Sequence, residues 1–179
     1  MKCNTTKTDS NKTVNTNSQY TNSQYTNHYF KSVTMSIKQA AWVHGNIVAL
    51  ESPSWRAFPQ GPGATVTPYN ESTVGWCHFA IPTPVILDGK RLRAGSAMAR
   101  LQTGPGAKII GFHVWDGDKR IAAYDNLNVT VSTPNMLRYD VPDRPEVLWG
   151  TVICVLVQFS GNVADNWVKM IGAGIDFFN

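Results

Sequence analysis

Three segments of this 179-residue chain place a tryptophan and a histidine two positions apart. Side chains two residues apart in a β-strand point to the same face of the sheet, so each pair would present an indole beside an imidazole. An indole face can stack on a sugar ring or a cation, and a neutral imidazole can bind a metal ion or exchange hydrogen bonds. The six residues are Trp42 and His44, Trp76 and His78, and His113 and Trp115.

Apolar side chains alternate with these pairs, which places them on the opposite faces of the same strands. If the three strands share one sheet, its less apolar face brings three indoles and three imidazoles together, and we take that face as the candidate site. Ile109 is expected on this outer face as well. The opposite, apolar faces are expected to hold Ala41, Val43, Ile47 and Ala49 in the first segment, Cys77, Phe79 and Ile81 in the second, and Ile110, Phe112 and Val114 in the third.

Three interpretations of this face remain open. In the first, the rings cover the sheet beneath a long loop or pack at a subunit interface. In the second, they form a binding face for a carbohydrate or a protein partner. In the third, three imidazoles hold zinc or iron with an open coordination position. Because no carboxylate ligand and no His-x-His pair accompanies the three histidines, we expect neither a metal nor a cofactor.

The segments around the pairs have the pattern of β-strands. Turn-forming residues recur about every ten residues, and helical periodicity is nearly absent. The pattern predicts an all-β fold, a two-sheet antiparallel β-sandwich of jelly-roll or immunoglobulin-like type. Residues 51–73 contain four prolines and two glycines and are expected to form a long surface loop. The expected strands are 41–50, 74–81, 85–87, 90–93, 97–103, 108–115, 120–124, 127–131, 137–141, 147–159 and 168–178.

The segment 151–159 is apolar on both faces, which predicts a central strand covered on both sides or at an oligomer contact. Cys77 and Cys154 lie in apolar strands and are expected to be buried, reduced thiols. The residues expected in the core are Phe79, Phe112, Ile153, Val155, Ile171, Ile175 and Phe177.

The first 34 residues differ in composition from the rest of the chain. They are rich in Asn, Thr, Ser, Gln and Tyr and repeat the sequence TNSQY at 16–20 and 21–25. A segment with so little apolar surface cannot offset the entropy lost on ordering. We therefore expect a disordered tail over residues 1–34 and one folded domain over residues 35–179.

Charge, hydropathy and cysteine content argue against nucleic-acid binding, membrane insertion and secretion. The net charge is +4, and because the tail holds four of the 16 basic and one of the 12 acidic residues, the folded part carries only +1. No basic stripe marks that part, so nucleic-acid binding is not favoured. Neither a transmembrane run of about 18 apolar residues nor a signal-peptide pattern is present. Three cysteines without a CxxC pair complete the pattern of a cytoplasmic protein.

Motifs of several enzyme classes do not occur in the sequence. It contains no HExxH, no Walker motif and no Gly-x-Ser-x-Gly. An enzyme remains the third expectation, a hydrolase or metal-dependent enzyme that uses His44, His78 or His113.

Four short sequences, in order along the chain, resemble a family of small bacterial β-rich proteins of uncharacterised function. They are AWVHG (41–45), HFAIPTPVI (78–86), HVWDG (113–117) and GAGIDF (172–177). The resemblance covers most of residues 40–178 and leaves the tail outside. It implies a bacterial β-sandwich and carries no catalytic residue with it.

The sequence as a whole favours a non-enzymatic β-sandwich module that binds a ligand or a protein partner, as a homo-oligomer. The alternative is a structural or assembly protein whose polar tail reaches a neighbouring subunit.

Overall fold

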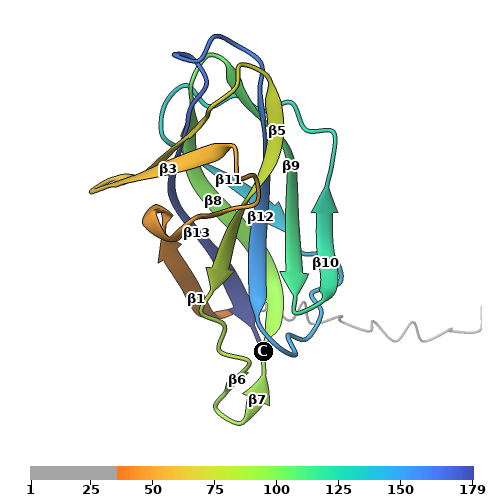
Figure 1. Cartoon of the computed structure of the whole chain (residues 1–179). Helices are drawn as coiled ribbons and strands as arrows, with labels where there is room; N and C mark the ends of the chain where they lie inside the picture. The colour runs from red at the N-terminus through yellow and green to blue at the C-terminus, as the bar shows by residue number, and fades with distance from the viewer. Residues whose placement is uncertain (1–35) are drawn as a thin grey trace, which may run out of the picture. The chain divides into compact units, whose positions relative to one another are not determined.

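Two antiparallel sheets pack face to face in the computed structural model, which describes residues 36–179 (Figure 1). The predicted disordered tail, residues 1–34, lies outside the described residues. The six-stranded sheet contains β1 (Ile37–His44), β3 (Trp55–Gln60), β4 (Gly63–Pro68), β8 (Arg93–Thr103), β11 (Asn135–Asp140) and β13 (Val168–Phe178). The five-stranded sheet contains β2 (Ala49–Leu50), β5 (Thr73–Ile81), β9 (Ala107–Asp116), β10 (Lys119–Tyr124) and β12 (Thr151–Phe159). A small hairpin pairs β6 (Ile86–Leu87) with β7 (Lys90–Arg91), and η1 (Gly45–Ile47) is a single 3-10 turn. The prediction of an all-β, two-sheet antiparallel sandwich is confirmed.

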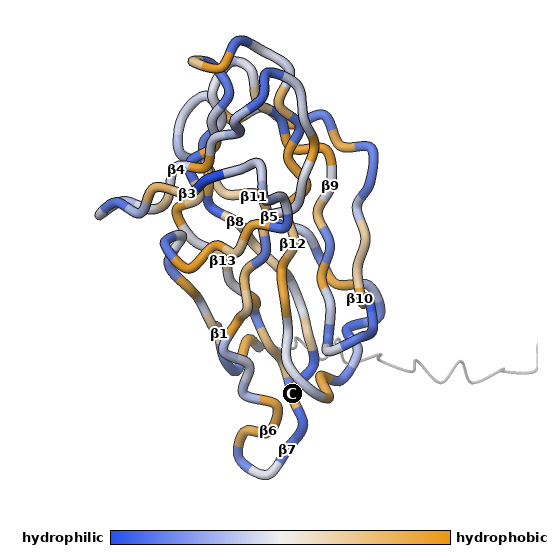
Figure 2. The backbone as a smooth tube through the Cα atoms, in the orientation of Figure 1, coloured by the Kyte–Doolittle hydropathy of each residue, from blue (hydrophilic) through white to orange (hydrophobic). Residues whose placement is uncertain are grey.

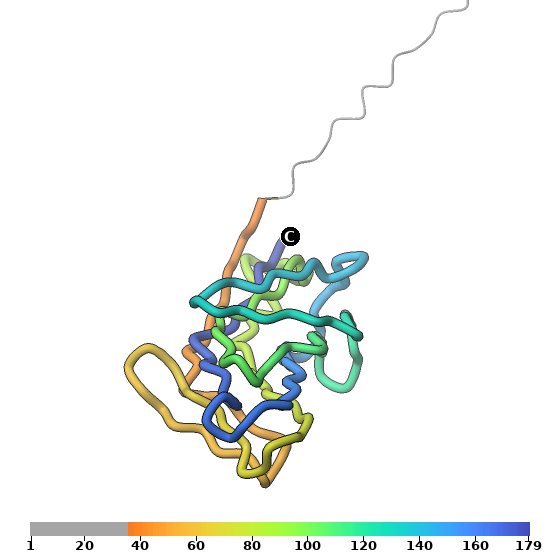
Figure 3. The backbone as a smooth tube through the Cα atoms, turned by 90° about the horizontal axis from the view of Figure 1, so that it is seen from above, coloured from red at the N-terminus to blue at the C-terminus, as the bar shows by residue number. Residues whose placement is uncertain are grey.

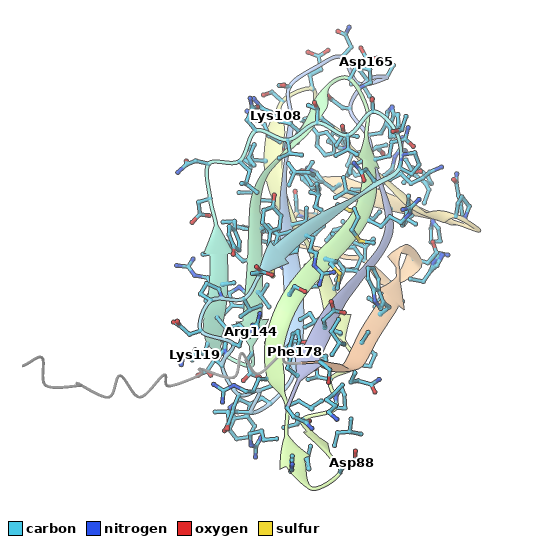
Figure 4. All side chains as sticks on the ribbon, turned by 180° about the vertical axis from the view of Figure 1, so that it is seen from behind. Asp88, Lys108, Lys119, Arg144, Asp165 and Phe178 are labelled. Atoms are coloured by element: carbon cyan, nitrogen blue, oxygen red, sulfur yellow. The ribbon has the colours of Figure 1, made fainter. Side chains whose placement is uncertain are left out.

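One strand is central in each sheet. In the five-stranded sheet β12 pairs with β5 on one side and β9 on the other, the place expected for its doubly apolar sequence. In the six-stranded sheet β13 pairs with β8 on one side and with β4 and β1 on the other. Figure 1 is seen from the side of the five-stranded sheet, and Figure 4 from behind. Lys108 and Asp165 lie at one end of the sandwich and Asp88 at the other (Figure 4).

The core lies between the two sheets and is built from alternate side chains of the central strands. Figure 2, which colours the backbone by hydropathy, shows hydrophobic residues along β12. Six of the seven predicted core residues are fully buried; they are Phe79, Phe112, Ile153, Val155, Ile175 and Phe177. Cys77 and Cys154 are buried and form no disulfide, as predicted.

Two β-bulges shift the alternation that the sequence analysis assumed. In β13 the pairing with β8 passes from Met170 to Gly172, so Ile171 is only half-buried and Met170 takes the core position. In β9 the pairing with β12 passes from Ile109 to Gly111, so Ile109 is buried and Ile110 is not. An extra residue in a strand turns every side chain before it to the other face. The core placements of Ile171 and Ile110, and the outward placement of Ile109, were therefore wrong.

The predicted strand 41–50 is two strands in different sheets. β1 pairs with β13, η1 turns the chain through Gly45, and β2 then pairs with β5. A β-carbon at Gly45 would lie 1.8 Å from the carbonyl oxygen of Met170, so a side chain does not fit at this corner. The corner leaves Ile47 and Ala49 exposed, against the prediction that they face the core.

The predicted loop 51–73 is instead a hairpin, β3–β4. Its alternation of buried Ala64, Val66 and Pro68 with less buried threonines is the pattern of a half-buried strand,. Pro59 lies on β3 at the edge of the sheet, where its missing N–H costs least,. Figures 1 and 3 show this hairpin projecting from the sandwich.

Two further predicted strands are shorter than expected. Residues 127–131 make one isolated bridge, between Val129 and Ile109. Strand β12 begins at Thr151, and residues 147–150 before it lie outside the strand. Over residues 36–179, no helix is long and apolar enough to cross a membrane.

Candidate functional site

Four of the six predicted site residues come together on the outer face of the five-stranded sheet. Trp76 and His78 lie on β5, and His113 and Trp115 lie on β9. Both strands flank β12, so the two pairs face each other across it. They line an open groove of about 490 Å³. The remaining lining residues are Glu51, Gly117, Arg120, Val152 and Cys154.

The indole of Trp76 lies across the sheet towards β9. Trp76 is paired with Leu156, and Leu156 is paired in turn with Gly111. A β-carbon at Gly111 would lie 3.1 Å from Cβ of Leu156 and 3.4 Å from the outer edge of the Trp76 ring. A side chain at Gly111 would therefore crowd Leu156 and touch the edge of the indole, which lies close over β9 at this position.

His113 holds the far side of this indole in place. Its ring centroid is 4.6 Å from that of Trp76, with the planes tilted by 44°. Its Nε2 is 2.7 Å from Oδ1 of Asp125; because an ionised carboxylate can only accept, Nε2 carries the hydrogen and donates it. With 7% of its surface exposed, His113 positions the Trp76 ring and leaves little of itself to contact a ligand.

His78 and Cys154 form the middle of the groove floor. Nδ1 of His78 lies 3.2 Å from Sγ of Cys154 across the β5–β12 pair. Burial, and to a lesser extent the Glu51 carboxylate, raise the pKa of the Cys154 thiol to about 11. A thiol is a weak nucleophile until it ionises, so this Cys–His pair does not form an activated nucleophile at neutral pH.

Opposite charges stand at two places along the groove. The guanidinium of Arg120 lies 6.0 Å from the centroid of the Trp115 ring, and these two residues are paired across β9 and β10. Glu51 is tied to the other tryptophan, since its backbone N–H donates to the carbonyl oxygen of Trp76 at 3.1 Å. The groove thus offers a cation beside Trp115 and a carboxylate close enough to Cys154 to raise the pKa of its thiol.

Trp42 and His44, the remaining two predicted site residues, lie in the other sheet. On β1, Trp42 lies over Gly172 and Gly174 of β13, where a β-carbon at Gly174 would meet its ring at 2.4 Å. His44 caps η1, its Nδ1 accepting from the N–H of Asn46 at 3.3 Å. A site made of all six residues is therefore not formed, because β1 and β5 belong to different sheets.

The three histidines of the possible metal site are likewise divided between the two sheets. His44 is in the six-stranded sheet, whereas His78 and His113 are in the five-stranded one. Among residues 36–179, no group of three or more His, Cys, Asp or Glu side chains is arranged to hold a metal ion. His78 and His113 instead face Cys154 and Asp125.

Sequence reasoning missed five residues that line the groove: Glu51, Gly117, Arg120, Val152 and Cys154. Val152 and Cys154 were assigned to a doubly buried strand, although their outer face is the groove floor. Arg120 could have been found from the Asp116-Gly117 turn, because a tight hairpin places it directly opposite Trp115,. Glu51 could not have been found in this way, because it lies at the groove only since the chain turns at η1 and passes into the five-stranded sheet.

Fold and groove together define a β-sandwich protein with an aromatic groove on one sheet. The chain belongs to family DUF6623, a family of unknown function, whose model matches residues 35–179. A comparison with curated proteins found no match.

Several solved structures share part of the backbone arrangement. The xylan-binding module CBM15 is 13% identical, with 74% of this chain and 97% of that chain covered and a TM-score of 0.43. The Stig cyclase Fisc from Fischerella sp. TAU is 11% identical, with 75% and 84% covered and a TM-score of 0.44. TmCBM61, solved with β-1,4-galactotriose, is 13% identical, with 76% and 86% covered and a TM-score of 0.38. Similarity of this extent carries no information on function, so a functional proposal has to rest on the groove itself.

Proposed function

We propose that this protein is a binding module that takes a carbohydrate in the groove on its five-stranded sheet. The observation that carries the proposal is the pairing of two half-buried indoles, Trp76 and Trp115, with polar side chains between and beside them. A sugar ring has apolar faces and a rim of hydroxyls, so it needs both an aromatic surface and hydrogen-bonding groups. Indoles supply the first with little loss of conformational entropy.

The polar groups of the groove suit a neutral, hydroxyl-rich ligand. Arg120 and Glu51 carry opposite charges, so they cancel in sum. Guanidinium hydrogens donate to hydroxyl oxygens, the carboxylate accepts from hydroxyl hydrogens, and the imidazole of His78 can do either. A polyanion such as nucleic acid would find no net positive charge here.

Binding rather than chemistry is also favoured by the state of the reactive groups. His113 is occupied by Asp125 and by the Trp76 ring. The thiol of Cys154 has a pKa of about 11, raised first by burial. The thiol is therefore not an activated nucleophile at neutral pH, and the His113 ring is buried between its two partners.

Affinity electrophoresis through gels that contain xylan, glucan, galactan or mannan tests the proposal. We expect at least one polysaccharide to retard the protein, and Trp76→Ala to abolish the retardation. Trp42→Ala is the matched control, because it removes an indole that is 42% exposed from the other sheet. Urea unfolding of each variant establishes that it is folded. Mobility unchanged in every gel, or equal retardation of wild type and Trp76→Ala, would reject the carbohydrate site.

A second candidate function is assembly into homo-oligomers, and the projecting hairpin favours it. β3 is at the edge of its sheet, and the hairpin region exposes Phe58 and Tyr69 with the Arg56 guanidinium 4.7 and 5.4 Å from their rings. Aromatic residues with arginine are typical of protein interfaces. Sedimentation equilibrium of wild type and Phe58→Ser decides this candidate: a concentration-dependent mass that the substitution removes supports it, and a constant monomer mass rules it out.

A further inference from the structure

A third indole, that of Trp149, stands beside the groove and is more exposed than either indole inside it. Its exposed fraction is 72%, the largest of any large apolar side chain among residues 36–179. The side chain lies against Gly117, which lines the groove: a β-carbon at Gly117 would be 2.9 Å from Cδ1 of Trp149 and 3.2 Å from its Cβ. Trp149 therefore extends the lining of the groove past the end of β9.

The backbone that carries Trp149 is fixed by a buried carboxylate. Asp116 is 4% exposed. Its Oδ1 accepts from the N–H groups of Trp149 at 2.9 Å and Gly150 at 3.0 Å, and its Oδ2 accepts from Leu148 at 2.7 Å. In addition, the N–H of Gly117 donates to the carbonyl oxygen of Gly150 at 2.9 Å. Hydrogen bonds to a charged acceptor are stronger than neutral ones, so this loop is held to the β9–β10 hairpin at four points.

An exposed indole on an ordered backbone is well placed to contact a ligand. An exposed tryptophan held at fixed geometry can contact a ligand with little further loss of entropy, which is why such residues dominate binding sites. Three hydrogen bonds to the Asp116 carboxylate and one between Gly117 and Gly150 fix the backbone that carries Trp149 without burying its ring.

The three indoles follow one another from the middle of the sheet towards this hairpin end. Trp76 is paired with Leu156 and Trp115 with Val152, four residues apart on β12. At a rise of about 3.3 Å per residue, this separates the backbone positions of the two tryptophans by about 13 Å along the strand direction. Trp149 lies beyond Trp115, against the hairpin residue Gly117. A ligand that touches all three must be longer than one sugar ring.

We propose that Trp149 is part of the binding site and that the ligand is a chain of linked sugar rings extending from Trp76 to Trp149. This inference rests on the proposed carbohydrate site and goes further in two ways. It adds a residue outside the groove itself, and it assigns the site to an oligosaccharide or to internal segments of a polysaccharide rather than to a free monosaccharide.

Isothermal titration with β-1,4-linked hexasaccharides and disaccharides of glucose, xylose, galactose and mannose, and with the four monosaccharides, tests it. We expect one hexasaccharide to bind at least about tenfold more tightly than its monosaccharide. Trp149→Ala should weaken that hexasaccharide by at least about fivefold, the loss typical of an important contact residue. It should leave the affinity for the corresponding disaccharide unchanged, and Trp149→Phe should retain most of the hexasaccharide affinity. Trp42→Ala is again the control and should change neither.

The outcomes separate this inference from the function on which it rests. If a hexasaccharide binds and Trp76→Ala abolishes binding while Trp149→Ala has no effect, the carbohydrate site stands and the role of Trp149 is refuted. If Trp149→Ala weakens long and short ligands equally, the chain-length assignment is refuted. If no saccharide in the panel binds, both proposals fail together.

Discussion

Removing the carboxylate of Asp116 should destabilise the protein far more than a change in a hairpin turn normally does. In Asp116→Ala, the N–H groups of Leu148, Trp149 and Gly150 lose their acceptor. A hydrogen bond to a charged group contributes about 1.5–3 kcal/mol. Leu148 and Trp149 are exposed enough for water to replace part of this. Taking the low end for each bond, we expect a loss of about 3–5 kcal/mol in the free energy of unfolding.

Urea unfolding followed by tryptophan fluorescence measures this loss directly. It corresponds to a fall in Tm of roughly 10 °C for a domain of this size. Asp116→Asn keeps Oδ1, which accepts two of the three bonds, so it should lose about half as much or less. Asp118→Ala is the matched control, because it removes an exposed carboxylate from the same hairpin. A loss under about 1 kcal/mol for Asp116→Ala, equal to that of the control, would refute the anchoring role of this side chain.

Three further predictions concern the core, the groove thiol and the tail. Phe112→Ala should cost about 3–5 kcal/mol in the free energy of unfolding, because Phe112 is fully buried against the Tyr139 ring,; under about 1 kcal/mol would contradict its core position. In a Cys3→Ser background, iodoacetamide should modify Cys154 at a rate that keeps rising up to a pH of about 11, because burial raises the pKa of its thiol and only the thiolate reacts,. Cys154→Ala identifies this reaction by removing it, and a rate that levels off near pH 9 would show an ordinary exposed thiol. Deleting residues 1–34 should change Tm by no more than about 2 °C, because the segment has few apolar groups to bury; calorimetry showing a fall of about 10 °C would mean that it packs on the domain.

Most of the fold could be predicted from the sequence, because strand alternation and tight turns depend on residues close together in the chain. Leu87 and Lys90 are paired around Asp88 and Gly89, both with positive φ, the geometry for which Asp-Gly is selected,. At the second hairpin the loop is Gly117-Asp118, with positive φ at the glycine but not at the aspartate, a type II′ pattern,. Hairpins of this kind set the register of their two strands independently of distant parts of the chain.

The errors arose where distant parts of the chain decide. Bulges at Ile110 and Ile171 follow from pairing with β12 and β8, and nothing adjacent to either residue in the sequence marks them. Sheet membership is likewise a long-range property, so the Trp-x-His pattern at Trp42 resembled the one at Trp76 although the strands belong to different sheets. The role of Trp149 depends on Asp116, 33 residues away, and could not be found from spacing.

The measurement that tests the central claim most directly is the mapping of backbone amide chemical shifts during titration with the oligosaccharide that binds best. If the groove is the site, the amides that shift will cluster on the outer face of the five-stranded sheet, around Trp76, Trp115 and Gly117, and Trp149 will join them when the ligand is long. The six-stranded sheet around Trp42 will remain unchanged. Shifts confined to that sheet or to the β3–β4 hairpin, or saturable binding with no change around Trp76, would contradict the account.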